Sequence, residues 1–225
     1  MTVKVTRTVR FCDLATDLLH HILYNDARPT ILVVCSTRDR FLGQLYAAIR
    51  TQTDEPGSHQ LLINSLGMLS KSSKIKLVFC PTLEHFRAYV SVLRVSSKMD
   101  SEERPVLVVL DLLALHVPTS EFSAQGLSRT LAMTVEVAAH EGMNLMLCEC
   151  RNALDPDNRA SGERLWYEHV PILNGSVRMG GEESGWGGRG VPVKRVAERW
   201  FEFNENIRVT RDTVDVRIAD TNYHE

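Results

Sequence analysis

The chain has 225 residues, of which 44% are hydrophobic and 24% are charged, and its formal net charge is −2. This length and apolar fraction suit one well-filled core, or at most two small ones. A net charge this close to zero excludes binding to nucleic acid through bulk charge, so any such contact must come from a local basic patch. No apolar run approaches the ~20 residues of a membrane-spanning helix, and the N-terminus lacks the apolar segment of a secretory signal. We therefore expect a soluble, intracellular protein.

The hydrophobic pattern predicts helices that alternate with strands. Apolar residues recur every three or four positions over 11–23, as on one face of a helix. By contrast, 31–35 is wholly apolar and rich in β-branched residues, as in a parallel strand that is covered on both faces. Gly142 marks the end of a helix. In chain order the predicted elements are a helix over 11–23, a strand over 31–35, helices over 39–50 and 61–69, a strand over 75–80, a helix over 86–93, a strand over 105–111, a helix over 127–140 and a strand over 144–150.

The four strand–helix units predict an α/β fold with a mostly parallel central sheet, right-handed crossovers and helices on its flanks. Beyond a polar loop over 151–163, apolar segments bounded by glycine-rich and polar stretches favour strands over 170–178, 191–204 and 207–219. We expect these strands to be antiparallel and joined by hairpins. The predicted organisation is a single domain over 1–225, with an N-terminal helix in 1–29, the parallel part in 30–150 and an antiparallel extension in 151–225.

The turn between strand 31–35 and helix 39–50 lies where a nucleotide-binding domain would carry its phosphate loop. Such a loop needs glycines, so that successive backbone N–H groups can wrap a phosphate, and a lysine that reaches the β- and γ-phosphates. This turn instead carries Arg38, Asp39 and Arg40, followed by the bulky Phe41. We therefore expect no nucleotide cofactor, no hydrolysis and no enzymatic activity, and predict a binding or scaffolding protein.

Asp111 ends the strand 105–111, as the Mg²⁺-orienting aspartate of a Walker B strand does. Many buried strands also end on an aspartate that caps the next helix. Because the phosphate loop is missing, capping is the better interpretation, and we predict no metal at this residue. No histidine groups with a serine or cysteine and an acid in a pattern that indicates a catalytic triad.

The five cysteines are an odd number, and three of them lie within apolar runs. This pattern indicates reduced, buried thiols of an intracellular protein rather than a disulfide framework. Cys148 and Cys150 flank Glu149, and either His140 or Cys80 could complete a zinc site with them. No second pair has metal-ligand spacing, so we interpret these cysteines as small buried hydrophobic residues and expect no metal.

The candidate nucleic-acid element is the glycine-rich segment 180–190 with the basic residues around it. Flexible backbone beside Arg and Lys, with an aromatic side chain that can stack on a base, is typical of contacts to single strands. A mobile hairpin loop with solvated charges is the alternative, because two glutamates in the segment weaken its field. Other arginines flank the loop after strand 144–150, at the carboxyl edge of the sheet where ligands usually bind. The candidate DNA-binding residues are Arg151, Arg159, Arg164, Arg178, Trp186, Arg189, Lys194 and Arg195.

The order of these pieces resembles the RecA-like recombinases and their paralogues. The resemblance covers most of 30–205 and rests on layout: a strand at the phosphate-loop position, the Walker-B-like Val106–Asp111, the strand 144–150 and a C-terminal part. That part reads Val170-Pro-Ile-Leu-Asn-Gly-Ser176 and later Arg195-Val-Ala-Glu-Arg-Trp-Phe-Glu-Phe203. The chain departs from the family at the phosphate loop. Non-hydrolysing members include the recombinase-paralogue subunits of the Shu complex and the RecA-like ring subunits of Elongator.

The resemblance implies a non-catalytic nuclear subunit that assembles with another RecA-like paralogue through sheet edges or exposed helices. Such a subunit would bind single-stranded or forked DNA and assist a recombinase in DNA repair by homologous recombination. The alternative is a structural subunit of the Elongator ring, which acts on transfer-RNA modification in the cytoplasm. A nucleotide-using enzyme with a divergent loop is disfavoured, because Arg-Asp-Arg-Phe leaves neither the space nor the donors for a triphosphate.

Overall fold

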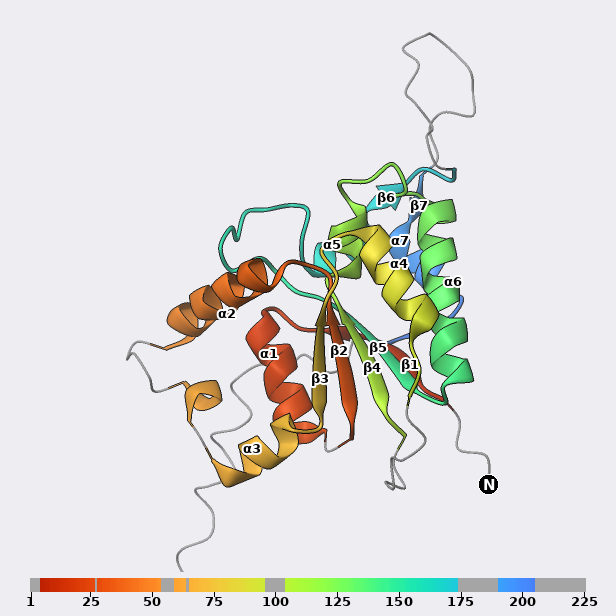
Figure 1. Cartoon of the computed structure of the whole chain (residues 1–225). Coiled ribbons are helices and arrows are strands. Elements are labelled where there is room, and N and C mark those ends of the chain that lie inside the picture. The colour runs from red at the N-terminus through yellow and green to blue at the C-terminus, as the bar shows by residue number, and fades with distance from the viewer. Residues whose placement is uncertain are drawn as a thin grey trace, which may run out of the picture.

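A computed structural model describes residues 5–26, 28–53, 59–63, 65–95, 104–173 and 190–204. Its centre is a six-stranded sheet with the order β3-β2-β4-β5-β1-β8 (Figure 1). Every described pairing in this sheet is parallel. Its strands are β1 (Arg7–Phe11), β2 (Thr30–Val34), β3 (Ile75–Phe79), β4 (Val106–Leu110), β5 (Asn144–Glu149) and β8 (Glu202–Asn204).

Helices cover both faces of the sheet (Figure 1). One face carries α1 (Ala15–His20), its continuation η1 (His21–Asn25), α2 (Arg38–Gln52) and α3 (Leu66–Ser72). The other face carries α4 (Leu83–Val92), α5 (Leu112–His116), α6 (Ala124–His140) and α7 (Val193–Ala197). The short elements are η2 (Gln60–Leu62), η3 (Glu163–Tyr167) and a small antiparallel pair, β6 (His169–Val170) with β7 (Val191–Pro192).

The core lies on both sides of the central strands, because every residue of β4 and β5 is buried. On the α1–α2 side the sheet packs against Leu18 and Phe41. On the α4–α6 side it packs against Phe86 and Leu131. The four predicted strands are confirmed, as are the helices predicted over 39–50, 86–93 and 127–140 and the end of α6 beside Gly142, whose φ of 66° suits glycine. The single helix predicted over 61–69 is instead the short η2 followed by the separate helix α3.

The sheet order creates a switch point between β2 and β4. From β2 the chain passes through α2 to the edge strand β3, whereas from β4 it passes through α5 and α6, on the other face, to β5. These two connections leave neighbouring strands in opposite directions. In open α/β sheets such a divergence opens a crevice outside the carboxyl ends of the strands, which is where ligands bind.

The prediction of a helix over 11–23 was wrong at its start. Arg7–Phe11 form a strand that lies between β5 and β8, and the helix begins only at Ala15. Val9 and Phe11 are buried in the sheet, so pairing with strands far along the chain overrides the local helical pattern.

The antiparallel C-terminal extension needs a second correction. Among the described residues, only the two-residue strands β6 and β7 are antiparallel, whereas β8 joins the main sheet parallel to β1. Within 191–204, Val193, Val196 and Ala197 are buried at helical spacing, which explains why a helix forms between β7 and β8. The expected strand over 207–219 lies outside the described residues. No helix in the described part of the chain is long and apolar enough to cross a membrane.

Candidate functional site

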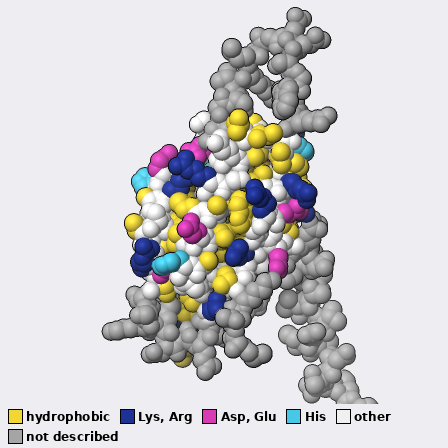
Figure 2. All heavy atoms as spheres, turned by 90° about the vertical axis from the view of Figure 1, so that its right-hand side faces the viewer, with side chains coloured by type: hydrophobic (Ala, Val, Ile, Leu, Met, Phe, Trp, Pro, Cys, Tyr) yellow, Lys and Arg dark blue, Asp and Glu magenta, His cyan; other side chains and the backbone are white. Residues whose placement is uncertain are grey.

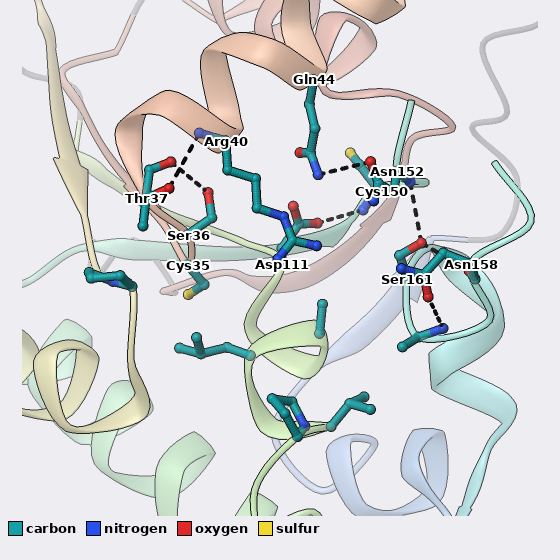
Figure 3. Close-up of a pocket in the computed structure, with 16 residues that line it drawn as sticks. Cys35, Ser36, Thr37, Arg40, Gln44, Asp111, Cys150, Asn152, Asn158 and Ser161 are labelled. Carbon is teal, nitrogen blue, oxygen red and sulfur yellow. Dashed lines mark hydrogen bonds between the residues drawn. The ribbon is translucent and has the colours of Figure 1, made fainter. Parts of the chain in front are cut away.

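A pocket of about 320 Å³ lies in the crevice at the switch point (Figure 3). The turns after four neighbouring strands line it, with Thr37 following β2, Pro81 following β3, Asp111 following β4 and Asn152 following β5. Ala114, Leu115, Val117 and Pro118, in and just after α5, form an apolar part of its wall. The pocket thus combines polar turns with an apolar wall, as small-molecule sites do.

Asp111 is the charged residue that the fold holds most tightly at this pocket. Its side chain is only 9% exposed, and its Oδ1 accepts a 2.9 Å hydrogen bond from the N–H of Cys150. Its own N–H donates to the carbonyl of Cys148 at 2.9 Å. Its φ of 62° is left-handed, a strained conformation for a residue that is not glycine. Backbone bonds to β5 therefore hold Asp111 in place at the pocket.

Glu149 forms a second buried carboxyl group behind Asp111. Its two oxygens accept hydrogen bonds from the N–H groups of Leu113, at 2.6 Å, and Ala114, at 3.2 Å. Glu149, and not Asp111, therefore satisfies the first N–H groups of α5, which corrects the expectation that Asp111 caps this helix.

The two carboxyl groups titrate together. Burial raises the pKa of Asp111 to about 7, although the Cys150 N–H and the positive charge of Arg40 act to lower it. Burial and the charge of Asp111 raise the pKa of Glu149 well above its usual range. The pair therefore does not carry two full negative charges at neutral pH.

Arg40 brings a positive charge to the same pocket from the first turn of α2. Its side chain extends from the helix toward Asp111 in Figure 3, but no ion pair joins the two residues. Thr37 caps this helix, since its Oγ1 accepts from the Arg40 N–H at 3.3 Å. Phe41, the next residue, is buried against Phe79 and anchors α2 to the sheet. Arg40 thus faces the pocket because Phe41 faces the core.

Amide and hydroxyl groups complete the polar wall. Gln44 donates to the Oδ1 of Asn152 at 3.2 Å, which ties α2 to the loop after β5. The N–H of Asn152 donates to the hydroxyl of Ser161 at 3.3 Å, and that hydroxyl donates to the carbonyl of Asn158 at 3.2 Å. Gly162 follows with φ at 83°, and a side chain at this position would meet the backbone of residue 151. The loop is therefore held as a fixed wall.

The polar turns and the apolar wall of the pocket suit the binding of a small polar molecule, and its thiols and acids do not indicate a catalytic or metal site. Cys35 and Cys150 line the pocket, Cys12 and Cys148 are also buried, and the sulfur atoms of Cys148 and Cys150 are 3.7 Å apart. A hydrogen bond with Cys148, together with burial, raises the pKa of the Cys12 thiol, and burial raises that of Cys35. Such thiols are poor nucleophiles. No group of three or more His, Cys, Asp or Glu residues within the described ranges could hold a metal ion.

Five of the eight predicted DNA-binding residues lie in the described part of the chain, where they form two groups. Arg151, Arg159 and Arg164 lie in and after the loop that walls the pocket, and Arg159 is exposed. Arg151 forms a 2.9 Å ion pair with Asp13. The Nε of Arg164 donates to the carbonyl of Ser161.

Lys194 and Arg195 lie on α7, which packs against η3. The ammonium group of Lys194 lies over the rings of Tyr167 and Phe203, and Arg195 pairs with Glu198 at 3.3 Å. On the face that carries α6, lysine and arginine side chains are separated by hydrophobic and acidic ones (Figure 2). Arg178, Trp186 and Arg189 lie outside the described residues.

Sequence reasoning noticed some pocket residues and missed others. Arg40 and Asp111 were both noticed, but as signs of a lost phosphate loop and a helix cap. Asn152 and Glu149 carried no usable signal, because Asn152 is bonded to Gln44, 108 positions away, and Glu149 to Leu113 and Ala114, 36 and 35 positions away. The rule that ligands bind at switch points would have found the pocket only with the strand order known.

Comparison with protein families matches residues 11–215 to the model described as SPAC22G7.03-like. Comparison with curated proteins finds no match to the chain.

Proposed function

The chain belongs to the SPAC22G7.03-like family, and we propose that it acts as a non-catalytic RecA-like subunit that assembles with another RecA-like subunit. In this role it binds DNA in the nucleus and assists recombinase loading during repair by homologous recombination. The proposal rests on the turns after β1 and β2, the two candidate positions for a phosphate loop in such a fold. Neither turn contains the glycines and the lysine that hold a phosphate.

The sheet order supports the RecA-like assignment and moves the phosphate-loop position. In RecA-like cores the phosphate-loop strand lies beside the strand that follows the Walker B strand, and not beside the Walker B strand itself. Here β1 pairs with β5, and β5 separates it from the Walker-B-like β4. The assignment therefore identifies β1, and not β2, as the phosphate-loop strand.

The turn after β1 lacks the residues of a phosphate loop. It consists of Cys12, Asp13 and Leu14 before α1 begins, with no glycine or lysine. The N–H of Leu14 donates to a carboxylate oxygen of Asp17 at 3.0 Å, so an acidic side chain occupies a donor that a phosphate would use. The turn after β2 likewise has no glycine or lysine, and the hydroxyl of Thr37 accepts from the Arg40 N–H. Both observations support a subunit that does not hydrolyse nucleotide.

Exposed apolar side chains support a protein partner. Leu66 is 86% exposed and Leu69 57% exposed on α3, and Tyr46 is 64% exposed on α2. Leu77 is 44% exposed on β3, the edge strand of the sheet. Exposed apolar side chains and an unpaired edge strand are features that a second protein covers in assemblies.

The DNA part of the proposal rests on basic residues whose surface pairings are weak. Exposed ion pairs such as Arg195–Glu198 stabilise a protein by roughly 0–1 kcal/mol, so a phosphate can replace the carboxylate. Lys194 lies beside Tyr167 on the same surface, where an aromatic ring can stack on a base.

The test is fluorescence anisotropy with labelled single-stranded DNA at two salt concentrations, using the chain co-expressed with its RecA-like partner. Replacing Arg189, Lys194 and Arg195 together by glutamine should weaken binding and lower the salt dependence, since each lost phosphate contact removes roughly one unit of the salt slope. Arg50→Gln, at the end of α2, is the control. Unchanged affinity in the triple variant would exclude this surface. No binding by the unsubstituted complex, with co-purification in a ring of RecA-like subunits, would instead favour the transfer-RNA-modification scaffold.

A further inference from the structure

The pocket at the switch point contains two opposite charges that are not paired with each other. Arg40 and Asp111 both line it, and no ion pair connects them. Oδ1 of Asp111 is bonded to the N–H of Cys150, while Oδ2 has no hydrogen-bond partner among the described residues. Asp111 is only 9% exposed, and its Oδ2 is not sealed in the interior, so this oxygen is left to accept a hydrogen bond from a donor group in the pocket.

The charges select the kind of ligand. A simple anion would be attracted by Arg40 but repelled by the carboxyl pair of Asp111 and Glu149, which lies just beneath. A simple cation would be attracted by the carboxyl pair but repelled by Arg40. A molecule with one group of each sign satisfies both sides, because each charge then meets its opposite in a partly desolvated site.

The volume and the walls limit the size of the ligand. About 320 Å³ is at the low end of small-molecule pockets, which range over roughly 300–1,000 Å³. The apolar wall formed by Leu115, Val117 and Pro118 suits an aliphatic part, while Gln44 and Asn158 offer amide groups at the rim. A dinucleotide is too large for this space, whereas an amino acid fits it.

We propose that this pocket binds an amino-acid-sized zwitterion, with its carboxylate at the guanidinium of Arg40 and its ammonium group at the carboxyl group of Asp111. The ammonium group supplies the donor that Oδ2 lacks. The carboxylate takes up the charge of Arg40 at the first turn of α2, a helix of 15 residues whose positive end favours an anion. Binding at this pocket is independent of DNA binding at α7, so either proposal can fail without the other.

The test is isothermal titration calorimetry of the full chain against the common L-amino acids, one at a time, at neutral pH. At least one should bind with measurable affinity. For that amino acid, the same molecule without its amino group and the same molecule without its carboxyl group should each bind roughly tenfold more weakly or worse, because each loses one charge-assisted contact.

Arg40→Gln and Asp111→Asn should each weaken binding of that amino acid by a similar factor. Arg38→Gln, in the same turn of α2 but outside the pocket lining, should bind as the unsubstituted chain does. Thermal unfolding of each variant separates lost binding from lost folding. The proposal is overturned if no amino acid binds, if the deaminated compound binds equally well, or if folded Arg40→Gln protein retains full affinity.

Discussion

The substitution Asp111→Asn should make the protein more stable at pH 8 than the unsubstituted chain, although it alters a buried and well-bonded side chain. Asparagine keeps an oxygen that can accept the hydrogen bond from the N–H of Cys150. It also adopts the left-handed backbone conformation more readily than most residues, so the φ of 62° is retained. What the substitution removes is the need to ionise a buried carboxyl group.

The pKa of Asp111 gives the size of the stability that its ionisation costs. Folding raises it from 3.8 to about 7, a difference of about 3 units, and each unit corresponds to about 1.36 kcal/mol. The unfolded chain loses this proton near pH 4, whereas the folded chain keeps it until about pH 7. Between these values the folded state binds more protons, so its stability falls as the pH rises, and above pH 7 the loss is complete. The full loss is ~4 kcal/mol, an upper bound because Glu149 shares the titration.

The measurement is urea unfolding at pH 5 and pH 8, followed by tryptophan fluorescence, since Trp166 is buried. Asp111→Asn should exceed the unsubstituted chain at both pH values, by up to ~2 kcal/mol at pH 5, where the unfolded carboxyl group is already ionised, and by up to ~4 kcal/mol at pH 8. Asp13→Asn is the control, because it breaks only an exposed ion pair with Arg151 and should change stability by less than ~1 kcal/mol. An Asp111→Asn protein that is less stable than the unsubstituted chain at pH 8 would refute the assignment of a raised pKa.

Three further results are expected. Phe41→Ala should lower the free energy of unfolding by ~3–5 kcal/mol, because it leaves a cavity where α2 packs on the sheet. Leu42→Ala, on the exposed side of α2, should lower it far less in the same urea titration. Gly162→Ala should lower the free energy of unfolding by ~1–3 kcal/mol, because φ is 83° and the new Cβ would lie 3.4 Å from a backbone atom. Gly67→Ala, with no neighbour within 4 Å of its Cβ, is the control and should leave the stability unchanged or raise it; thermal unfolding measures both. The purified chain should not hydrolyse ATP in a phosphate-release assay, and turnover above a matched blank would contradict the proposed function.

The fold was predictable from the sequence wherever burial was complete. A strand covered on both faces has no polar positions, so 105–111 and 144–150 stand out as apolar runs and correspond to β4 and β5. The segment 7–11 contains Arg7 and Arg10 beside only two apolar residues, Val9 and Phe11, and runs directly into a helical pattern. Its strand character comes from β5 and β8, which no local window contains.

The site was less accessible to sequence reasoning than the fold. Asp111 could be noticed because it ends a strand, but its partner Glu149 looks like any other residue of β5. Arg40 could be noticed because it stands where a glycine was sought. That these two charges share a cavity follows only from the order of the strands, which places the ends of β2 and β4 side by side.

The interior position of β1 has a consequence for how the protein is made. Among the described strands, β1 is the first to leave the ribosome, yet its neighbours β5 and β8 lie in the second half of the chain. Even the bond between the Thr6 N–H and the Asn144 side chain spans 138 positions. Contacts so distant in sequence slow folding, and β1 must stay unpaired until β5 has been synthesised. A truncated chain that begins after residue 11 would therefore lack an internal strand, and it would expose the edges of both β5 and β8 to other chains.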